Sequence, residues 1–242
     1  MELWGLTDKG NVRSQNQDYY LTLALPNATA AVLCDGMGGA KSGNVASKLA
    51  SEVFLRELRR AFRDDLSAEK IENVLDTAVG LANTAVYENA KLSEDMNGMG
   101  TTLVGVLLHA GTLYTVNVGD SRAYLINSDG VTCITTDHSL VELMVKRGEL
   151  TPEQAKSDPR KNVITRAVGT ERTVQCDIFR QPIFPGDNVL LCSDGLSNLL
   201  ADQELLFEVV HGKKKQDCCQ RLIEIAKERG APDNVTAVLI SI

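Results

Sequence analysis

Four turns of this sequence place an aspartate next to an apolar run that is typical of a β-strand. Asp35 and Asp194 follow such runs and are themselves followed by glycine, and Asp120 follows the run at 116–118. Asp233 stands instead directly before the last apolar run of the chain. Because the ends of several strands can meet at one edge of a sandwich of sheets, the four carboxylates could converge there.

Such a group of carboxylates needs a counter-ion. Like charges in a partly desolvated site repel one another and force protonation, so the cluster normally implies divalent cations. Ligation by oxygen alone favours Mg²⁺ or Mn²⁺ over Zn²⁺. The three histidines, at 109, 138 and 211, have no zinc-binding spacing. Two hard cations bridged by Asp35 would lower the pKa of a shared water and supply hydroxide at neutral pH.

Simple turns, EF-hands and two further phosphatase chemistries fit these residues less well. An aspartate taken alone is more often part of a turn or cap, but the recurrence of the pattern favours a site. No Asp-rich loop has the ligand spacing of an EF-hand. No cysteine has an arginine six positions later and no D-x-D sequence offers an aspartyl nucleophile, which excludes both phosphatase chemistries that form a covalent intermediate on those residues. Arg13 is a candidate for binding phosphoester oxygens, since a guanidinium binds them in a bidentate way, although a single arginine is more often a surface residue.

The elements that would position these residues occur in blocks along the chain. Alternating patterns predict strands, and helical periodicity with caps at Ser67 and Thr151 predicts helices. The expected strands are 3–7, 19–25, 30–34, 103–108, 113–118, 123–126, 131–135, 174–180, 189–192 and 235–240, and the expected helices are 45–62, 67–86, 140–147, a segment from 151, one from 202, and 216–229. We interpret the strands between 103 and 135 as one antiparallel meander. The fold class is therefore α+β, with antiparallel sheets packed face to face and helices outside.

The composition is that of a soluble globular chain, which we interpret as a single domain over residues 1–242. It is 43% apolar and 24% charged with a net charge of -7, which argues against disorder, against a nucleic-acid-binding surface and against acidic membranes. The segment 1–13 lacks the features of a signal peptide, and no apolar run could span a bilayer, so we expect a cytoplasmic protein. Without CxxC spacing, the cysteines are expected to be reduced and buried. They stand at positions 34, 133, 176, 192, 218 and 219.

A series of motifs in this order resembles the metal-dependent protein phosphatases, the type 2C Ser/Thr phosphatases, and in particular their bacterial single-domain members. The resemblance covers nearly the whole chain. The motifs are DKGNVR at 8–13, NQD at 16–18, DGMGG at 35–39, AS at 46–47, GTT at 100–102, VGDSRAY at 118–124, TDHS at 136–139, TRAVG at 165–169, SDGL at 193–196 and DNVT at 233–236.

The resemblance implies a sandwich of two antiparallel sheets flanked by helix pairs, in four layers, with a two-metal centre of Mn²⁺ or Mg²⁺ at one end. Carried over by motif, Asp35 bridges both ions, the Gly36 carbonyl helps to bind the second, and Asp194 and Asp233 hold the first. Arg13 corresponds to the residue that binds the phosphate. The implied activity is hydrolysis of phosphoserine and phosphothreonine by direct attack of a metal-bridging hydroxide, without a covalent intermediate.

Asp120 resembles the ligand of a weaker third metal site in this family. Asn198 stands where some members have Asp for that metal, which predicts weaker binding here. Gln17 stands where many relatives carry Glu near the second metal, and the neighbouring Asp18 is expected to compensate, through water.

Two further departures concern the acid that protonates the leaving group. Met37 stands where animal members place a histidine, and Ala40 stands where bacterial relatives often have one. The general acid is therefore unassigned, and metal-bound water or solvent could serve.

A second interpretation keeps the fold without the activity. A catalytically silent pseudophosphatase that binds phosphoproteins would be favoured by loss of the metal-binding aspartates, whereas all three of Asp35, Asp194 and Asp233 are present. The resemblance further implies phosphoprotein partners, a cognate Ser/Thr kinase with its substrates, and a monomer. Residues 140–162 correspond to a variable flap beside the site, which could select substrates or be an ordinary solvated surface.

Overall fold

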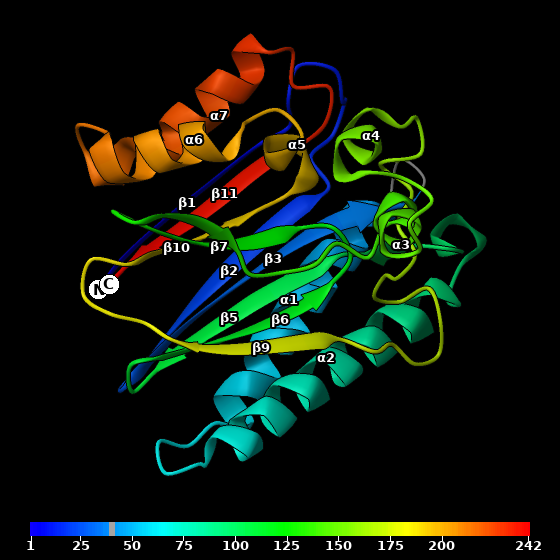
Figure 1. Ribbon diagram of the computed structural model, residues 1–242. Helices are drawn as coiled ribbons and strands as arrows, with labels where there is room; N and C mark the ends of the chain where they lie inside the picture. Colours follow the sequence, from blue (N-terminus) through cyan, green and yellow to red (C-terminus); the bar gives the residue numbers. More distant parts are fainter. Residues whose placement is uncertain (39–41) are drawn as a thin grey trace.

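Two antiparallel β-sheets pack face to face in the computed structural model, which describes residues 1–38 and 42–242 (Figure 1). Two residues singled out in the sequence, Gly39 and Ala40, lie outside the described residues. The first sheet has the strand order β1-β11-β10-β7-β8. Its strands are β1 (Glu2–Asp8), β11 (Val235–Ser241), β10 (Asn188–Cys192), β7 (Arg122–Asn127) and β8 (Gly130–Cys133).

The second sheet has the order β2-β3-β5-β6-β9, with the short β4 paired to the end of β3. Alternation along the interior strand β3 explains the packing, because Ala30 and Val32 face the helices while Ala31 and Leu33 face the other sheet. Both faces of this strand are therefore buried. The strands are β2 (Asp18–Leu25), β3 (Ala28–Met37), β4 (Gly100–Thr101), β5 (Leu103–His109), β6 (Thr112–Val118) and β9 (Asp177–Pro182).

Helices cover the two outer faces of the sandwich (Figure 1). The long pair α1 (Gly43–Ala61) and α2 (Ala68–Ala90) packs on the second sheet, and α6 (Asp202–Leu206), the π-helical turn η2 (Phe207–His211) and α7 (Cys218–Glu228) pack on the first. The described chain thus has helix, sheet, sheet and helix layers, which confirms the predicted α+β sandwich. The shorter elements are η1 (Glu94–Met96), α3 (Leu140–Lys146), α4 (Pro152–Ser157), α5 (Asp194–Ser197) and η3 (Lys215–Asp217).

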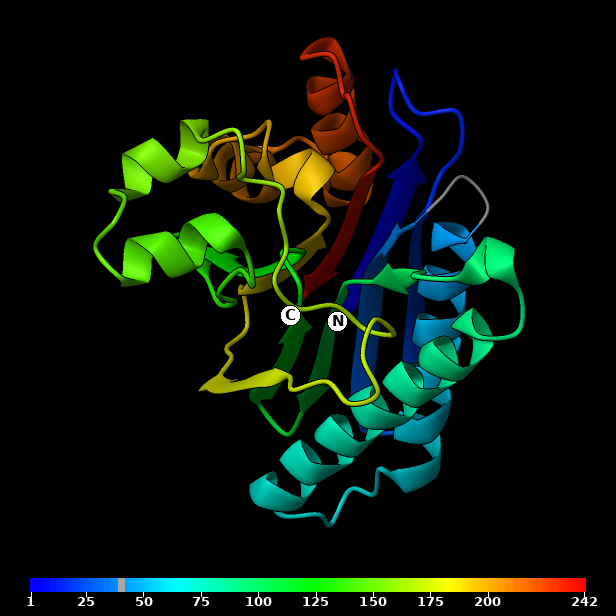
Figure 2. The ribbon, with the colours of Figure 1, turned by 90° about the vertical axis from the view of Figure 1, so that its right-hand side faces the viewer.

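The helix starts agree with the capping signals. The Ser67 side chain accepts a hydrogen bond from the Lys70 backbone, and Thr151 forms a capping box with Gln154. Figure 2 shows α3 and α4, in green, projecting from the side of the sandwich. None of the helices formed by residues 1–38 and 42–242 has the length and apolar character needed to cross a membrane.

Two expectations from the sequence were wrong. The four strands between 103 and 135 do not form one meander, because β5 and β6 pair in the second sheet while β7 and β8 pair in the first. The chain crosses between the sheets at residues 119–121, and alternation along a strand carries no information about such a crossing. All six cysteines are free thiols, but Cys133 is exposed and Cys176 is only partly buried.

Candidate metal and phosphate site

The sheet register brings the predicted aspartates to one end of the sandwich. Asp18, at the start of β2, is paired directly with Asp35 near the end of β3. In the other sheet β10 and β11 are antiparallel neighbours, so Asp194, two residues after β10, and Asp233, two residues before β11, lie at the same edge. Asp120 precedes β7, whose first residue pairs with the last residue of β10. Five chain segments therefore deliver one carboxylate each to this edge.

Asp35 is held by its backbone at the centre of the group. Its N–H donates to Thr102 Oγ1 at 2.9 Å, and its carbonyl accepts from the Thr102 N–H at 2.8 Å and from Thr101 Oγ1 at 2.8 Å. Desolvation raises the pKa of Asp35 well above its ordinary value, and the charges of the other four aspartates add to the effect. Without a counter-ion, the negative charges of the neighbouring carboxylates thus make ionisation of Asp35 unfavourable.

Asp18 is buried behind this group. Its Oδ2 accepts hydrogen bonds from Ser193 Oγ at 2.8 Å and from Thr236 Oγ1 at 2.6 Å, whereas its Oδ1 is buried and lacks a hydrogen-bond partner among the described residues. Burial raises the pKa of Asp18 to about 6, although the two hydroxyls oppose the shift. An oriented oxygen without a partner is typical of a ligand position for a cation or its water.

Asp194 and Asp233 each make contacts that bear on the sequence predictions. Asp194 Oδ2 accepts from Asn198 Nδ2 at 3.1 Å, and Asp233 Oδ2 accepts from Arg13 Nη2 at 2.8 Å. Burial and then the charge of Asp233 raise the pKa of Asp194. The Arg13 side chain is 54% exposed, so its guanidinium is accessible to a ligand as well as to Asp233.

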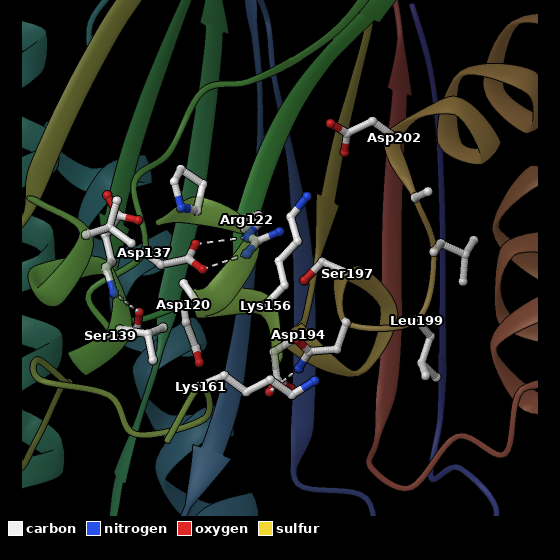
Figure 3. A pocket seen from close by; sticks show the side chains of 18 residues that line it. Asp120, Arg122, Asp137, Ser139, Lys156, Lys161, Asp194, Ser197, Leu199 and Asp202 are labelled. Carbon is white, nitrogen blue, oxygen red and sulfur yellow. Dashed lines mark hydrogen bonds and ion pairs between the residues drawn. The ribbon is translucent and has the colours of Figure 1, made fainter. Parts of the chain in front are cut away.

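Asp120 lies in a cavity of about 720 Å³ that adjoins the site (Figure 3). Asp194 also lines this cavity, and Lys156 and Lys161 line it from residues 140–162. Burial, followed by the charge of Asp194, raises the pKa of Asp120 to about 8. The cavity therefore extends from the carboxylates to the segment that we expected to be a flap.

Comparison with known proteins decides the family. The family model described as protein phosphatase 2C matches residues 10–239. The chain belongs to the protein phosphatase 2C family.

Relatives within this family agree over almost the full length. The serine/threonine phosphatase stp of Listeria innocua is 36% identical over 239 residues, which are 97% of this chain and 93% of that protein. The structure of the serine/threonine phosphatase Stp1 from Staphylococcus aureus has a TM-score of 0.91 at 36% identity and covers 100% of this chain and 94% of that one. The catalytic domain of the serine/threonine protein phosphatase PstP, solved in complex with two manganese ions, has a TM-score of 0.83 at 34% identity, with 98% and 96% covered.

The family and enzyme class predicted from the motifs are confirmed. The chain is a protein phosphatase of the metal-dependent 2C type, and the comparisons do not favour the pseudophosphatase. The hydroxyls of Ser193 and Thr236 were not predicted as partners of Asp18, although both residues stand inside motifs that the sequence shows. His138, which lies in the TDHS motif, was likewise given no role.

The donor groups fit hard divalent cations. Within residues 1–38 and 42–242, no three His, Cys, Asp or Glu side chains are gathered closely enough to complete a metal site by themselves. Mg²⁺ characteristically keeps several waters and takes only one or two protein carboxylates, so a site of this kind does not require three side chains in contact. The unpartnered Oδ1 of Asp18 and the raised pKa values of Asp35 and Asp194 are the features that a bound cation would relieve.

Gly195→Ala is expected to destabilise the protein by about 1–3 kcal/mol and to weaken metal binding. A Cβ atom at residue 195 would lie 1.9 Å from the backbone oxygen of Asn234, so the loops that carry Asp194 and Asp233 would have to separate. Urea unfolding in the presence of chelator measures the first effect, and manganese titration measures the second. Gly80→Ala in α2 is the matched control, because a Cβ there meets no atom within 4 Å. Equal stability of Gly195→Ala and the wild type would contradict the close approach.

Proposed function

We propose that this chain is a protein serine/threonine phosphatase in which Asp35, Asp194 and Asp233 hold two divalent cations and Arg13 binds the phosphate. The observation that carries the proposal is the convergence of carboxylates from five chain segments on one edge of the sandwich, with a guanidinium beside them. Asp35 is the central member, because the other four aspartates all raise its pKa. The family membership supports the same assignment.

Each residue has a distinct part in the proposed reaction. When bound, divalent cations lower the pKa of a coordinated water and stabilise charge on phosphoryl oxygens. Asp35 would contribute to both cation positions, the Gly36 carbonyl would help to hold one cation, and Asp194 and Asp233 would hold the other. Arg13 binds two non-bridging oxygens of the phosphate and orients the phosphorus.

We propose Mn²⁺ or Mg²⁺ as the cations, two in each site, with a weaker third position at Asp120. Asn198 supports a low affinity for the third cation. Its side-chain amide donates a hydrogen bond to Asp194, whereas a cation at this position needs an oxygen ligand. Asp18 contributes through its unpartnered Oδ1, directly or through a water. No described residue is assigned as general acid, since Met37 is apolar.

The proposed substrates are phosphoserine and phosphothreonine proteins of a bacterial cytoplasm, with a cognate Ser/Thr kinase acting on the same targets. The relatives' names as serine/threonine phosphatases support this substrate class. We further propose one domain, a monomer, and a role for residues 140–162 in substrate selection. The cavity shared by Asp120 and Lys161 supports that role.

Hydrolysis of phosphothreonine peptides is expected to require Mn²⁺ or Mg²⁺ and to stop in excess chelator. Asp194→Asn is expected to remove the activity, because the remaining carboxylates cannot hold the cation pair. Matched phosphotyrosine peptides are the specificity control, and released phosphate is the measurement. Turnover without metal would contradict the proposed mechanism. Tight phosphopeptide binding without turnover at any metal concentration would favour the pseudophosphatase.

A further inference from the structure

His138 holds both backbone groups of the residue that precedes Asp120. Its ring Nδ1 accepts a hydrogen bond from the Gly119 N–H at 3.0 Å, and its own N–H donates to the Gly119 carbonyl at 2.9 Å. The His138 side chain is only 7% exposed. Gly119 has φ +108°, and a Cβ there would lie 2.6 Å from Thr102 Cγ2, so no other residue fits this bend without strain. His138 thus makes two of the hydrogen bonds that hold Gly119, and the Asn117 side chain donates a third to the Gly119 carbonyl at 3.3 Å.

The hydrogen bonds also determine the tautomer of His138. Because Nδ1 is an acceptor, the ring proton is on Nε2, which donates to Asp177 Oδ2 at 3.1 Å. Arg166 Nη1 donates to the other oxygen, Asp177 Oδ1, at 2.8 Å. Arg166 Nη1 and His138 Nε2 lie 3.0 Å apart. In this tautomer both atoms are donors, so they do not bond to each other, and each donates to the Asp177 carboxylate.

The pKa shifts agree with this geometry. Burial lowers the pKa of His138, and its hydrogen bond to Asp177 opposes the shift only in part. Burial raises the pKa of Asp177, but the hydrogen bonds from Arg166 and His138 outweigh it and leave the pKa below its ordinary value. A neutral imidazole with an ionised carboxylate behind it keeps Nδ1 free to accept from Gly119.

The same residue lies at the base of residues 140–162. The His138 carbonyl accepts from the Thr165 N–H at 2.7 Å, and the next residue, Ser139, forms an isolated β-bridge with Ile164. Ser139 also caps α3 through a hydrogen bond from the Glu142 N–H at 3.2 Å. The outgoing and returning ends of this segment are therefore fastened at His138.

We propose that His138 is a positioning residue that fixes the orientation of the Asp120 carboxylate through Gly119. It also couples this orientation to the base of residues 140–162, and Asp177 fixes the imidazole tautomer. In this role His138 acts through Gly119 and not by contact with substrate or cation. The proposal rests on the proposed role of Asp120 as a metal ligand. Metal-site residues of this kind, which act through a ligand's orientation, typically affect affinity or activity 10- to 100-fold.

Two substitutions separate the two hydrogen bonds of the ring. In His138→Asn the side-chain oxygen can replace Nδ1 and accept from Gly119, but the side chain is too short to reach Asp177. In His138→Gln the amide can take the place of Nε2 and reach Asp177, but Gly119 loses its acceptor. We expect the glutamine variant to need on the order of tenfold more Mn²⁺ for half-maximal kcat, and the asparagine variant to need less than about threefold more.

Amide hydrogen exchange in chelator supplies a readout that is independent of activity. The Gly119 N–H, and the N–H groups of Leu140 and Thr165 that close the base of the segment, are expected to exchange faster in His138→Gln than in His138→Asn. His211→Asn, at an exposed histidine, is the control and should change neither readout. If His138→Gln fails to fold, Asp177→Asn tests the same proposal, because it removes the carboxylate that fixes the His138 tautomer. This variant is expected to fold, since the Asp177 side chain is 37% exposed.

The outcomes separate this inference from the proposed function. A wild-type enzyme without any dependence on Mn²⁺ would overturn the metal site itself. A wild type that depends on Mn²⁺, together with equal metal dependence and equal Gly119 exchange in both His138 variants, would overturn only the positioning role, even if both variants had a lower Tm.

Discussion

Asp35→Asn is expected to reduce phosphopeptide hydrolysis on the order of a thousandfold while making the metal-free protein more stable. The loss of rate follows from removal of the carboxylate that we propose to lie between the two cation positions. The gain in stability follows because the pKa of Asp35 is raised well above its ordinary value of about 4 by desolvation and by the neighbouring aspartates. At neutral pH, folding of the metal-free chain must therefore either protonate this group or hold it against repulsion.

The sign of the pH dependence follows from linkage. A carboxyl with a raised pKa binds more protons in the folded state than in the unfolded state, so its ionisation destabilises the folded protein as the pH rises above about 4. We expect the Tm of Asp35→Asn in chelator to exceed that of the wild type by about 3 °C or more at pH 7.5, with a smaller difference at pH 5. Added Mn²⁺ should raise the Tm of the wild type and leave that of the variant nearly unchanged.

Asp65→Asn, at an exposed aspartate, is the control for the change in net charge. It should alter neither the rate nor the response to Mn²⁺. A lower Tm for Asp35→Asn in chelator would show that the carboxylates do not repel one another in the folded protein.

Arg13→Ala is expected to lower kcat/KM for a phosphothreonine peptide on the order of a hundredfold. Arg13→Lys should recover little of this loss, because an ammonium group cannot bind two phosphate oxygens in the fork geometry of a guanidinium. The side chain is 54% exposed and its ion pair with Asp233 is at the surface, so the fold should lose at most about 1 kcal/mol.

Steady-state kinetics at saturating Mn²⁺, together with a manganese titration, separate phosphate binding from an indirect effect through Asp233. If Arg13 acts on the phosphate, the manganese requirement of Arg13→Ala should stay close to that of the wild type. Arg59→Ala, on the exposed face of α1, is the matched control and should retain full activity. Unchanged kcat and KM in Arg13→Ala would show that Arg13 does not bind the phosphate.

Local patterns were sufficient to name the elements and the aspartates. Apolar runs of period two identify most strands within a few residues, and the caps at Ser67 and Thr151 mark helix starts that the structure confirms. Asp35, Asp120, Asp194 and Asp233 stand out because each interrupts or borders such a run. These signals lie within a few neighbouring residues, so they can be read without knowledge of the pairing.

The arrangement of those elements depended on contacts between distant parts of the chain. Neither the pairing of Asp18 with Asp35 nor the crossing of the chain between the sheets after β6 follows from alternation. The hydroxyls that hold Asp18 come from residues 175 and 218 positions away, and Gly119 meets His138 only because the chain returns past the sheet crossing. Local propensity reports which residues can form a strand or a ligand, whereas the tertiary packing decides which of them share an edge, because burial and hydrogen bonding are satisfied by neighbours in space.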